Sequence, residues 1–298
     1  MLPNPRTTKF FPKTPLPIKQ RAFLARNELE VFFGGAGGSG KSQALLLAAL
    51  QFVDTPGYNA LILRRTFADL SLPGALMDKA REFLAPFEAT GEAQWNAQEH
   101  RFRFYPSGAN LQFGYLEHEN DKYRYQGGGW HYLAFDEIAQ FSLTQYQFLF
   151  GWLRRTKSTI DIPLRVRSAS NPIGPGKEWV KQRFIVEGKQ DGRVFIPARA
   201  KDNPYLDYDS YVKSLMNLDP ITRQQILEGD WDARQPGGMF RREWFDVVTE
   251  YPRGFRTVRY WDLAATEENG RNDPDYTVGL KMIYDNEKFW VLDVVRVR

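Results

Sequence analysis

Eight residues, Gly35 to Ser42, have the spacing G-x-x-x-x-G-K-S, which is typical of a loop that binds the phosphates of a nucleoside triphosphate. Glycine lets such a backbone curl so that its N–H groups face phosphate oxygens, and the following helix adds the positive end of its dipole. We expect Lys41 to reach the β- and γ-phosphates and Ser42 to hold Mg²⁺. The predicted nucleotide-binding residues of the loop are Gly35, Gly37, Gly38, Ser39, Gly40, Lys41 and Ser42.

A pair of acids, Asp136 and Glu137, follows the apolar run 130–135. Taken alone, an acidic pair after a strand is more often the start of a helix. Together with a phosphate loop, it predicts a metal ligand at Asp136 and a general base at Glu137, which would polarise the attacking water. The candidate metal ligands of this site are therefore Ser42 and Asp136.

Two further groups could act on the γ-phosphate. Asn171 lies in Ser170-Asn171-Pro172 at the end of the next predicted strand, where it could sense the phosphate, although Asn-Pro is also an ordinary turn signal. An arginine is expected to neutralise charge in the transition state. Arg64 and Arg65 follow a predicted strand and are candidates, while Arg154 and Arg155 could act on a neighbouring subunit. Taken one at a time, each of these arginines is more often a surface residue.

The elements around these residues alternate between strands and helices. Residues 29–33 read as a buried strand and 43–50 as a helix, followed by a strand at 59–64, a helix at 75–84 and strands at 130–135 and 164–169. This order predicts a mostly parallel sheet flanked by helices. Residues 101–105 and 110–115 alternate and predict an antiparallel hairpin. Residues 1–19 read as a proline-rich arm, and 20–26 as a short helix.

The pattern changes after Pro236-Gly237-Gly238. Strands are predicted at 256–263, 276–284 and 289–297, which suggests an antiparallel meander without a covering helix. We therefore predict three segments: an ATPase domain at 1–235 that includes the arm and a closing segment, a linker at 236–255, and an incomplete second domain at 256–298.

Composition and charge indicate which classes of protein this chain resembles. The chain has 298 residues, no cysteine and a net charge of +4, and no apolar run is long enough to span a membrane. We expect a soluble protein of the cytoplasm that is not secreted. Residues 151–200 contain eleven Lys or Arg against four acids, a basic excess that could follow a phosphate backbone or be a solvated surface.

Several segments, in this order, resemble the large terminase subunit of tailed bacteriophages, the motor that packages viral DNA. They are 15–20 before the phosphate loop, 63–70 after the second strand, Tyr125-Gln126-Gly127, Phe135-Asp136-Glu137, Ser170-Asn171-Pro172, 202–205, Gly229-Asp230-Trp231 and Trp261-Asp262-Leu263-Ala264. Many family members carry an arginine inside the phosphate loop, but this chain has Ala36, Gly37 and Gly38 there. The resemblance therefore implies that a catalytic arginine comes from elsewhere.

The resemblance implies a P-loop ATPase domain that uses ATP and Mg²⁺, with Gln20 recognising adenine, followed by the start of an RNase H-like nuclease. Asp262 would be a first nuclease metal ligand and Asp275 a weaker candidate, with the remaining acids missing from this chain. Implied partners are double-stranded DNA, a portal protein on the procapsid and a small terminase subunit. The subunits would form a homo-oligomeric ring when assembled, or a monomer when isolated. A helicase-like motor, a non-catalytic ATP- or DNA-binding fragment and a self-sufficient nuclease are the alternatives.

Overall fold

The computed structural model describes residues 4–12, 16–233, 244–264, 276–285 and 288–297. The chain divides into two units, Met1–Arg234 and Gln235–Arg298, each with its own sheet. The predicted linker residues Pro236-Gly237-Gly238 and the candidate ligand Asp275 lie outside the described residues, as does Pro15.

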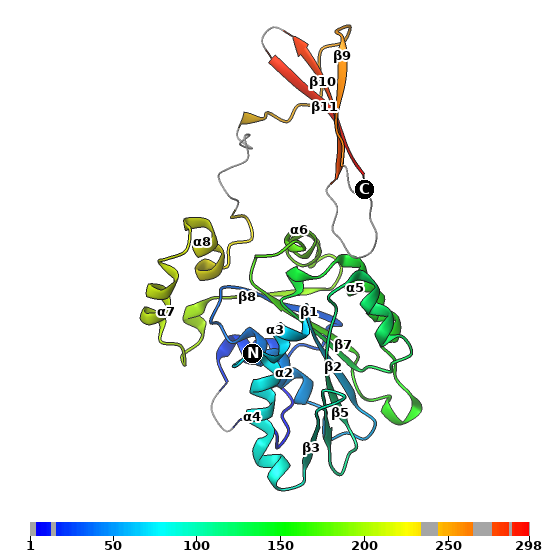
Figure 1. Cartoon of the computed structure of the whole chain (residues 1–298), viewed down its shortest axis with the longest axis vertical. Coiled ribbons are helices and arrows are strands. Elements are labelled where there is room, and N and C mark those ends of the chain that lie inside the picture. Colours follow the sequence, from blue (N-terminus) through cyan, green and yellow to red (C-terminus); the bar gives the residue numbers. More distant parts are fainter. Residues whose placement is uncertain (1–3, 13–15, 234–243, 265–275, 286–287, 298) are drawn as a thin grey trace. The chain divides into compact units, whose positions relative to one another are not determined.

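The first unit is built on an eight-stranded sheet, whose strands are labelled in Figure 1. In chain order they are β1 (Glu30–Gly35), β2 (Asn59–Arg64), β3 (Ala93–Asn96), β4 (Arg101–Phe104), β5 (Asn110–Tyr115), β6 (Tyr132–Asp136), β7 (Arg165–Ser170) and β8 (Val194–Ala198). Their order across the sheet is β3-β4-β5-β2-β6-β7-β1-β8.

The six strands from β5 to β8 in this order are parallel, and only β3, β4 and β5 pair antiparallel. The predicted mostly parallel sheet and the predicted hairpin are therefore both confirmed. Because β1, β6 and β7 are adjacent and parallel, their carboxyl ends meet at one edge of the sheet. The phosphate loop, Asp136-Glu137 and Asn171 follow directly at that edge.

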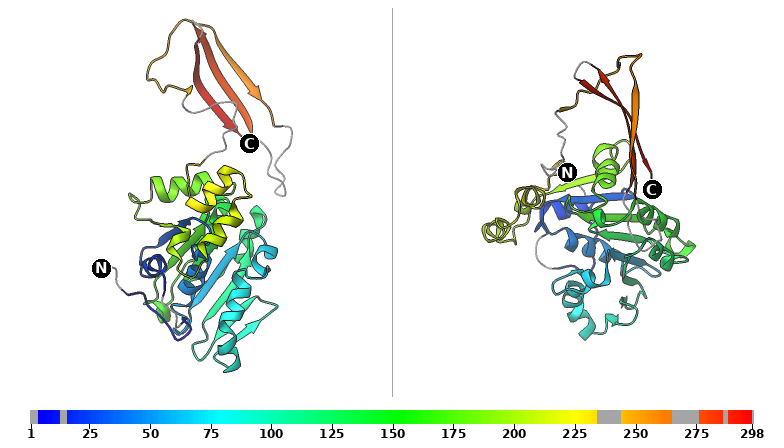
Figure 2. Two further views of the ribbon diagram at one scale, coloured as in Figure 1. Left: turned by 90° about the vertical axis from the view of Figure 1, so that its left-hand side faces the viewer. Right: turned by 45° about the horizontal axis from the view of Figure 1, so that its top comes forward.

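Helices cover both faces of this sheet (Figures 1 and 2). They are α1 (Ile18–Leu24), α2 (Lys41–Leu50), α3 (Phe67–Ser71), α4 (Leu76–Ala89), α5 (Leu143–Phe148), α6 (Lys177–Lys181), α7 (Tyr208–Leu215) and α8 (Pro220–Glu228). Short 3-10 segments are η1 (Glu119–Tyr125), η2 (Ile138–Gln140), η3 (Leu149–Trp152), η4 (Lys157–Thr159) and η6 (Ala200–Asp202), and η5 (Gln182–Val186) is a π segment. Helix α4 continues past Pro86, five residues beyond the predicted end, because Phe87 still packs against the core.

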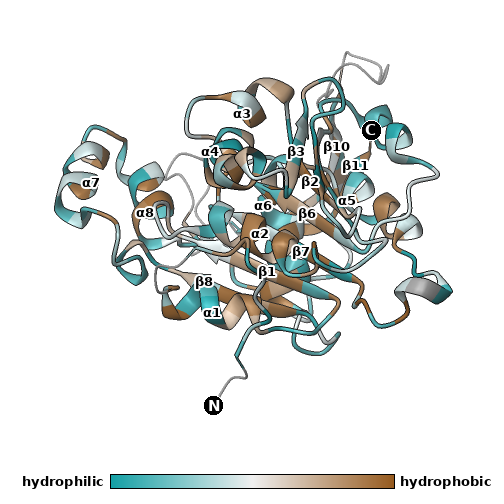
Figure 3. Ribbon diagram, turned by 90° about the horizontal axis from the view of Figure 1, so that it is seen from below, coloured by the Kyte–Doolittle hydropathy of each residue, from teal (hydrophilic) through white to brown (hydrophobic). Residues whose placement is uncertain are grey.

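Alternating residues of each central strand face opposite layers of the core. In β1, Val31 and Phe33 pack with α2 and α4 in one cluster, whereas Phe32 packs with Tyr146 of α5 and Val180 of α6 in the other. A parallel strand buried on both faces must be apolar throughout, which explains the unbroken apolar runs in the sequence. Figure 3 shows hydrophobic residues concentrated on α2 and the central strands.

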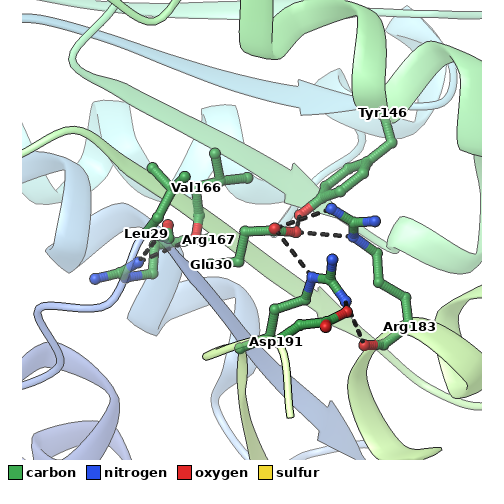
Figure 4. Close-up of polar contacts among 8 residues, drawn as sticks. Leu29, Glu30, Tyr146, Val166, Arg167, Arg183 and Asp191 are labelled. Carbon is green, nitrogen blue, oxygen red and sulfur yellow. Dashed lines mark hydrogen bonds and ion pairs between the residues drawn. The ribbon is translucent and has the colours of Figure 1, made fainter. Parts of the chain in front are cut away.

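Four arginines from the basic stretch 151–200 bind groups within the first unit, and two of them are fully buried. Arg165 and Arg167 of β7 are 2% and 1% exposed. Arg167 donates to the backbone carbonyls of Arg26, Glu28 and Leu29 at 2.7 to 3.2 Å. Arg183 and Arg193 both bind Glu30 at the start of β1 (Figure 4). Four of the eleven basic residues in this stretch are therefore structural, because their guanidinium groups satisfy buried carbonyls and one buried carboxylate.

The second unit contains three described strands, β9 (Thr257–Asp262), β10 (Thr277–Asp285) and β11 (Lys288–Val297). They form an antiparallel sheet in the order β11-β10-β9, as the predicted meander requires. Large apolar side chains on these strands are exposed, including Tyr260 at 76% and Phe289 at 69%. Three antiparallel strands occur in many folds, so the RNase H character of this unit stays a prediction.

Candidate nucleotide-binding site

The phosphate loop joins β1 to α2 at the carboxyl edge of the first sheet. Within the described part of the chain, the N–H groups of residues 38 to 42 have no hydrogen-bond acceptor. They sit at the N-terminus of α2, where free N–H groups and the helix dipole favour an anion. Gly40 has φ +81°, and a Cβ there would lie 2.6 Å from the side-chain nitrogen Nε2 of Gln20. The loop therefore has the geometry of a phosphate cradle.

Lys41 is folded back onto the loop. Its Nζ donates to the side-chain oxygen of Asn171 at 2.8 Å, to the backbone oxygen of Ala36, and to that of Gly35 at 3.4 Å. The side chain is 6% exposed. Burial lowers the pKa of Lys41 to about 8, opposed by the nearby charges of Glu137 and Asp136. Asn171, predicted as a phosphate sensor, thus holds the lysine that the motif assigns to the phosphates.

Ser42 and Asp136 are brought together from α2 and β6. The hydroxyl of Ser42 donates to Asp136 Oδ1 at 2.9 Å, and Arg64 at the end of β2 forms an ion pair with Asp136 Oδ2. The Asp136 side chain is 1% exposed, so these two partners account for its buried charge. The adjacent hydroxyl and carboxylate oxygens are hard ligands of the kind that Mg²⁺ prefers.

A magnesium ion in a phosphate-loop site takes one or two protein ligands and completes its shell with phosphates and water. The Ser42 hydroxyl and the Asp136 carboxylate lie side by side and could supply two such ligands. No group of three or more His, Cys, Asp or Glu residues that could hold a metal was found among the residues that the structure describes.

Glu137 follows Asp136 in a strained conformation. Its φ of +56° lies in the left-handed region, which is uncommon for a residue other than glycine. Its carboxylate accepts from the Ser170 hydroxyl at 3.0 Å and from the Asn171 N–H at 3.3 Å. Burial and the charge of Asp136 raise its pKa, opposed by Lys41 and Arg64. A carboxylate with a raised pKa beside a phosphate cradle suits a general base, and backbone strain concentrates at such functional positions.

The sequence matches one protein-family model, described as "Terminase large subunit, T4likevirus-type, N-terminal", over residues 32–247. The chain belongs to the terminase large subunit family. The matched range contains the phosphate loop, the acidic pair, Asn171 and helices α7 and α8. The comparison with curated proteins found no match.

Solved large terminases share the fold of this terminase subunit. The large terminase of a thermophilic bacteriophage, in complex with ATP-gamma-S, is 15% identical with a TM-score of 0.56, covering 94% of this chain and 68% of that one. The large terminase of bacteriophage HK97 is 12% identical with a TM-score of 0.57, covering 94% and 63%. A mutant ATPase domain of the Thermus phage P74-26 large terminase is 13% identical with a TM-score of 0.50, covering 73% and 94%.

The end of β8 and the segment after it pack directly on the phosphate loop in this terminase subunit. The backbone oxygens of Ala198 and Ile226 accept from the N–H groups of Ala36 and Gly37 at 2.8 and 2.7 Å, and the Asn203 side chain donates to the Gly38 oxygen at 2.8 Å. Gly229 ends α8 with φ +69°, and a Cβ there would lie 2.4 Å from the Ala36 nitrogen. These contacts were not predicted, since most of them use backbone atoms that leave no side-chain pattern.

The other predicted residues of this terminase subunit lie as follows. Gln20 is 2% exposed, and its amide donates to the Gly40 oxygen at 2.8 Å, so adenine recognition stays a prediction. Arg65 points to the Gln140 carbonyl at 3.4 Å rather than to Asp136. Arg154 and Arg155 lie in the segment before β7, next to the amino ends of the strands and away from the phosphate loop. Asp262 ends β9 in the second unit.

In the described residues, no helix has both the length and the apolarity that a membrane span requires.

Proposed function

We propose that this chain is the ATPase of a viral DNA-packaging motor, hydrolysing ATP to translocate double-stranded DNA into a procapsid. The observation that carries the proposal is the convergence of Lys41, Ser42, Asp136, Glu137 and Asn171 on one phosphate cradle, in a chain of the large terminase family. The chain spans 68% of the large terminase of the thermophilic bacteriophage and 63% of that of HK97, so the activity of a whole terminase is part of the proposal.

Each residue has a role that follows from its position. The free N–H groups of the loop and Lys41 bind the phosphates, and Glu137 orients and deprotonates the attacking water. Mg²⁺ held by Ser42 and Asp136 supplies charge neutralisation of the phosphates when bound. Asn171 contacts both Lys41 and Glu137, which makes it the residue that reports whether the γ-phosphate is present.

The portal of the procapsid and a small terminase subunit are the proposed partners, in a homo-oligomeric ring that works in the cytoplasm of the host. Three segments are proposed: the ATPase domain, a linker, and the opening strands of an RNase H-like nuclease in which Asp262 would hold a metal. Cleavage of DNA is expected only where the remaining metal ligands are present.

The test is Mg²⁺-dependent ATP turnover with and without linear double-stranded DNA, comparing the parent with Glu137→Gln. We expect the variant to bind ATP and lose turnover by about 100-fold or more, the range of a lost general base. Glu178→Gln, on the exposed surface of α6, is the matched control and should turn over normally. Equal turnover in Glu137→Gln and the parent would remove Glu137 from the mechanism. Unwinding of a forked duplex would favour a helicase instead, and ATP binding without any turnover a non-catalytic fragment.

A further inference from the structure

The ion pair between Arg64 and Asp136 lies at the position that the proposed metal must share. Asp136 is 1% exposed, and both of its oxygens are engaged, Oδ1 by the Ser42 hydroxyl at 2.9 Å and Oδ2 by Arg64. Arg64 is 25% exposed, so its guanidinium is the outward-facing partner. A cation that binds Ser42 and Asp136 therefore meets a carboxylate whose charge is already compensated.

Arg64 is the cationic side chain that pairs directly with Asp136. The Lys41 Nζ instead donates to Asn171 at 2.8 Å. A divalent cation beside Asp136 would add two positive charges next to the Arg64 guanidinium. Like charges at ion-pair distance in a poorly solvated site repel strongly.

We propose that Arg64 is a built-in counter-cation that holds Asp136 in place in the nucleotide-free protein and is displaced from it when the metal–nucleotide complex binds. This inference rests on the proposed function, because it takes the metal to bind at Ser42 and Asp136. Arg64 is thus a positioning residue: it holds the buried carboxylate of Asp136 in one orientation. It also makes metal binding depend on the phosphates, which supply a new anion for the released guanidinium.

Arg65 provides a matched control within the same chain. It is the next residue, carries the same charge and contacts the Gln140 carbonyl at 3.4 Å and the Gln145 side chain at 3.5 Å. Among the described residues, Arg65 forms no hydrogen bond or ion pair with Asp136. An effect that is specific to Arg64 therefore reports the ion pair rather than the general charge of this region.

The experiment measures Mn²⁺ binding by electron paramagnetic resonance in the full chain, first without nucleotide. We expect Arg64→Gln to bind Mn²⁺ at least about tenfold more tightly than the parent does, because the cation that competes for Asp136 has been removed. Arg65→Gln should bind like the parent, and so should Arg64→Lys, which keeps the charge. With ADP present, the advantage of Arg64→Gln should largely disappear, because the phosphates then bind the guanidinium that the metal displaces from Asp136 in the parent.

The outcomes separate this inference from the proposed function. Mn²⁺ binding in Arg64→Gln that is no tighter than in the parent, while Asp136→Asn abolishes binding, would overturn the role of Arg64 and leave the metal site standing. No Mn²⁺ binding in any variant, with or without ADP, would overturn both. Should Arg64→Gln not fold, the ¹⁵N spectrum of the arginine Nε–H groups in the parent decides: a spectrum in which Mg²⁺ and ADP move no arginine signal would refute the displacement.

Discussion

Replacing Glu30 by glutamine tests how far one buried carboxylate stabilises the first sheet. Glu30 begins β1 and is 7% exposed. It accepts two bonds from Arg183 at 2.9 Å, one from Arg193 at 3.2 Å and one from the Tyr146 hydroxyl at 2.8 Å (Figure 4). The substitution keeps the shape of the side chain but leaves two guanidinium groups without this counter-charge.

The expected loss follows from the burial of the partners. Removing one member of a buried ion pair costs about 3–5 kcal/mol of unfolding free energy. The side chains of Arg183 and Arg193 are 16% and 17% exposed, and Arg193 also pairs with Asp191, so both retain some solvation or a second partner. We therefore expect the lower end of that range, about 3 kcal/mol.

The assay is a urea titration read by hydrogen exchange of peptides from β1, because this signal reports the first unit by itself. Glu28→Gln is the control: Glu28 pairs with Arg26 at 3.2 Å, but the two side chains are 34% and 33% exposed. An exposed pair of this kind contributes about 1 kcal/mol or less. Equal effects of Glu30→Gln and Glu28→Gln would refute the reasoning that burial gives the Glu30 cluster its energy.

Two further predictions concern the phosphate loop. The pKa of Lys41 is lowered to about 8, so its ammonium loses its proton as the pH rises through that value, and the affinity for ATP should fall over the same interval. Calorimetry at about pH 8.5 in two buffers of different ionisation enthalpy should show proton uptake on binding, absent in Lys41→Arg, and a binding enthalpy independent of the buffer would contradict it. Gly229→Ala should weaken ATP binding, because its Cβ would lie 2.4 Å from the Ala36 nitrogen, whereas Gly91→Ala, at φ +73° with nothing within 4 Å, should lose only about 1–2 kcal/mol of stability. Equal ATP affinity in the two glycine variants, measured by the same calorimetry, would show that the close contact between Gly229 and the loop does not affect ATP binding.

The arrangement of the candidate site follows from sequence more completely than its contacts do. Ser42 and Asp136 are 94 residues apart, and Lys41 and Asn171 are 130 apart, yet both pairs touch. Three apolar runs, each followed by polar residues, are sufficient to predict this meeting, because the carboxyl ends of adjacent parallel strands share an edge. What the runs do not specify is the order of the strands across the sheet, which is what places β7 between β6 and β1.

The sequence does not predict that Arg165 and Arg167 are buried. Arg165 and Arg167 alternate along a strand with apolar residues, a pattern that normally indicates one solvated face. In the structure both are buried, because Arg167 satisfies carbonyls in the connection between α1 and β1, and Arg165 donates to the Ala48 carbonyl at the end of α2. The need for those donors arises from backbone groups left unpaired by the fold. Composition counts charges but carries no information about such unpaired carbonyls.

The phosphate loop is joined by hydrogen bonds to the end of β8 and to α8. Backbone oxygens of Ala198 and Ile226 fix the first half of the loop, while the second half keeps its N–H groups free for phosphate. Lys41 and Glu137 are both hydrogen-bonded to Asn171. A phosphate that binds Lys41 in place of Asn171 therefore also changes the hydrogen bonding around Glu137. Because Ile226 of α8 accepts a hydrogen bond from the Gly37 N–H, a rearrangement of the loop is transmitted directly to α8. A motor needs such a connection if hydrolysis at the sheet edge is to move anything beyond it.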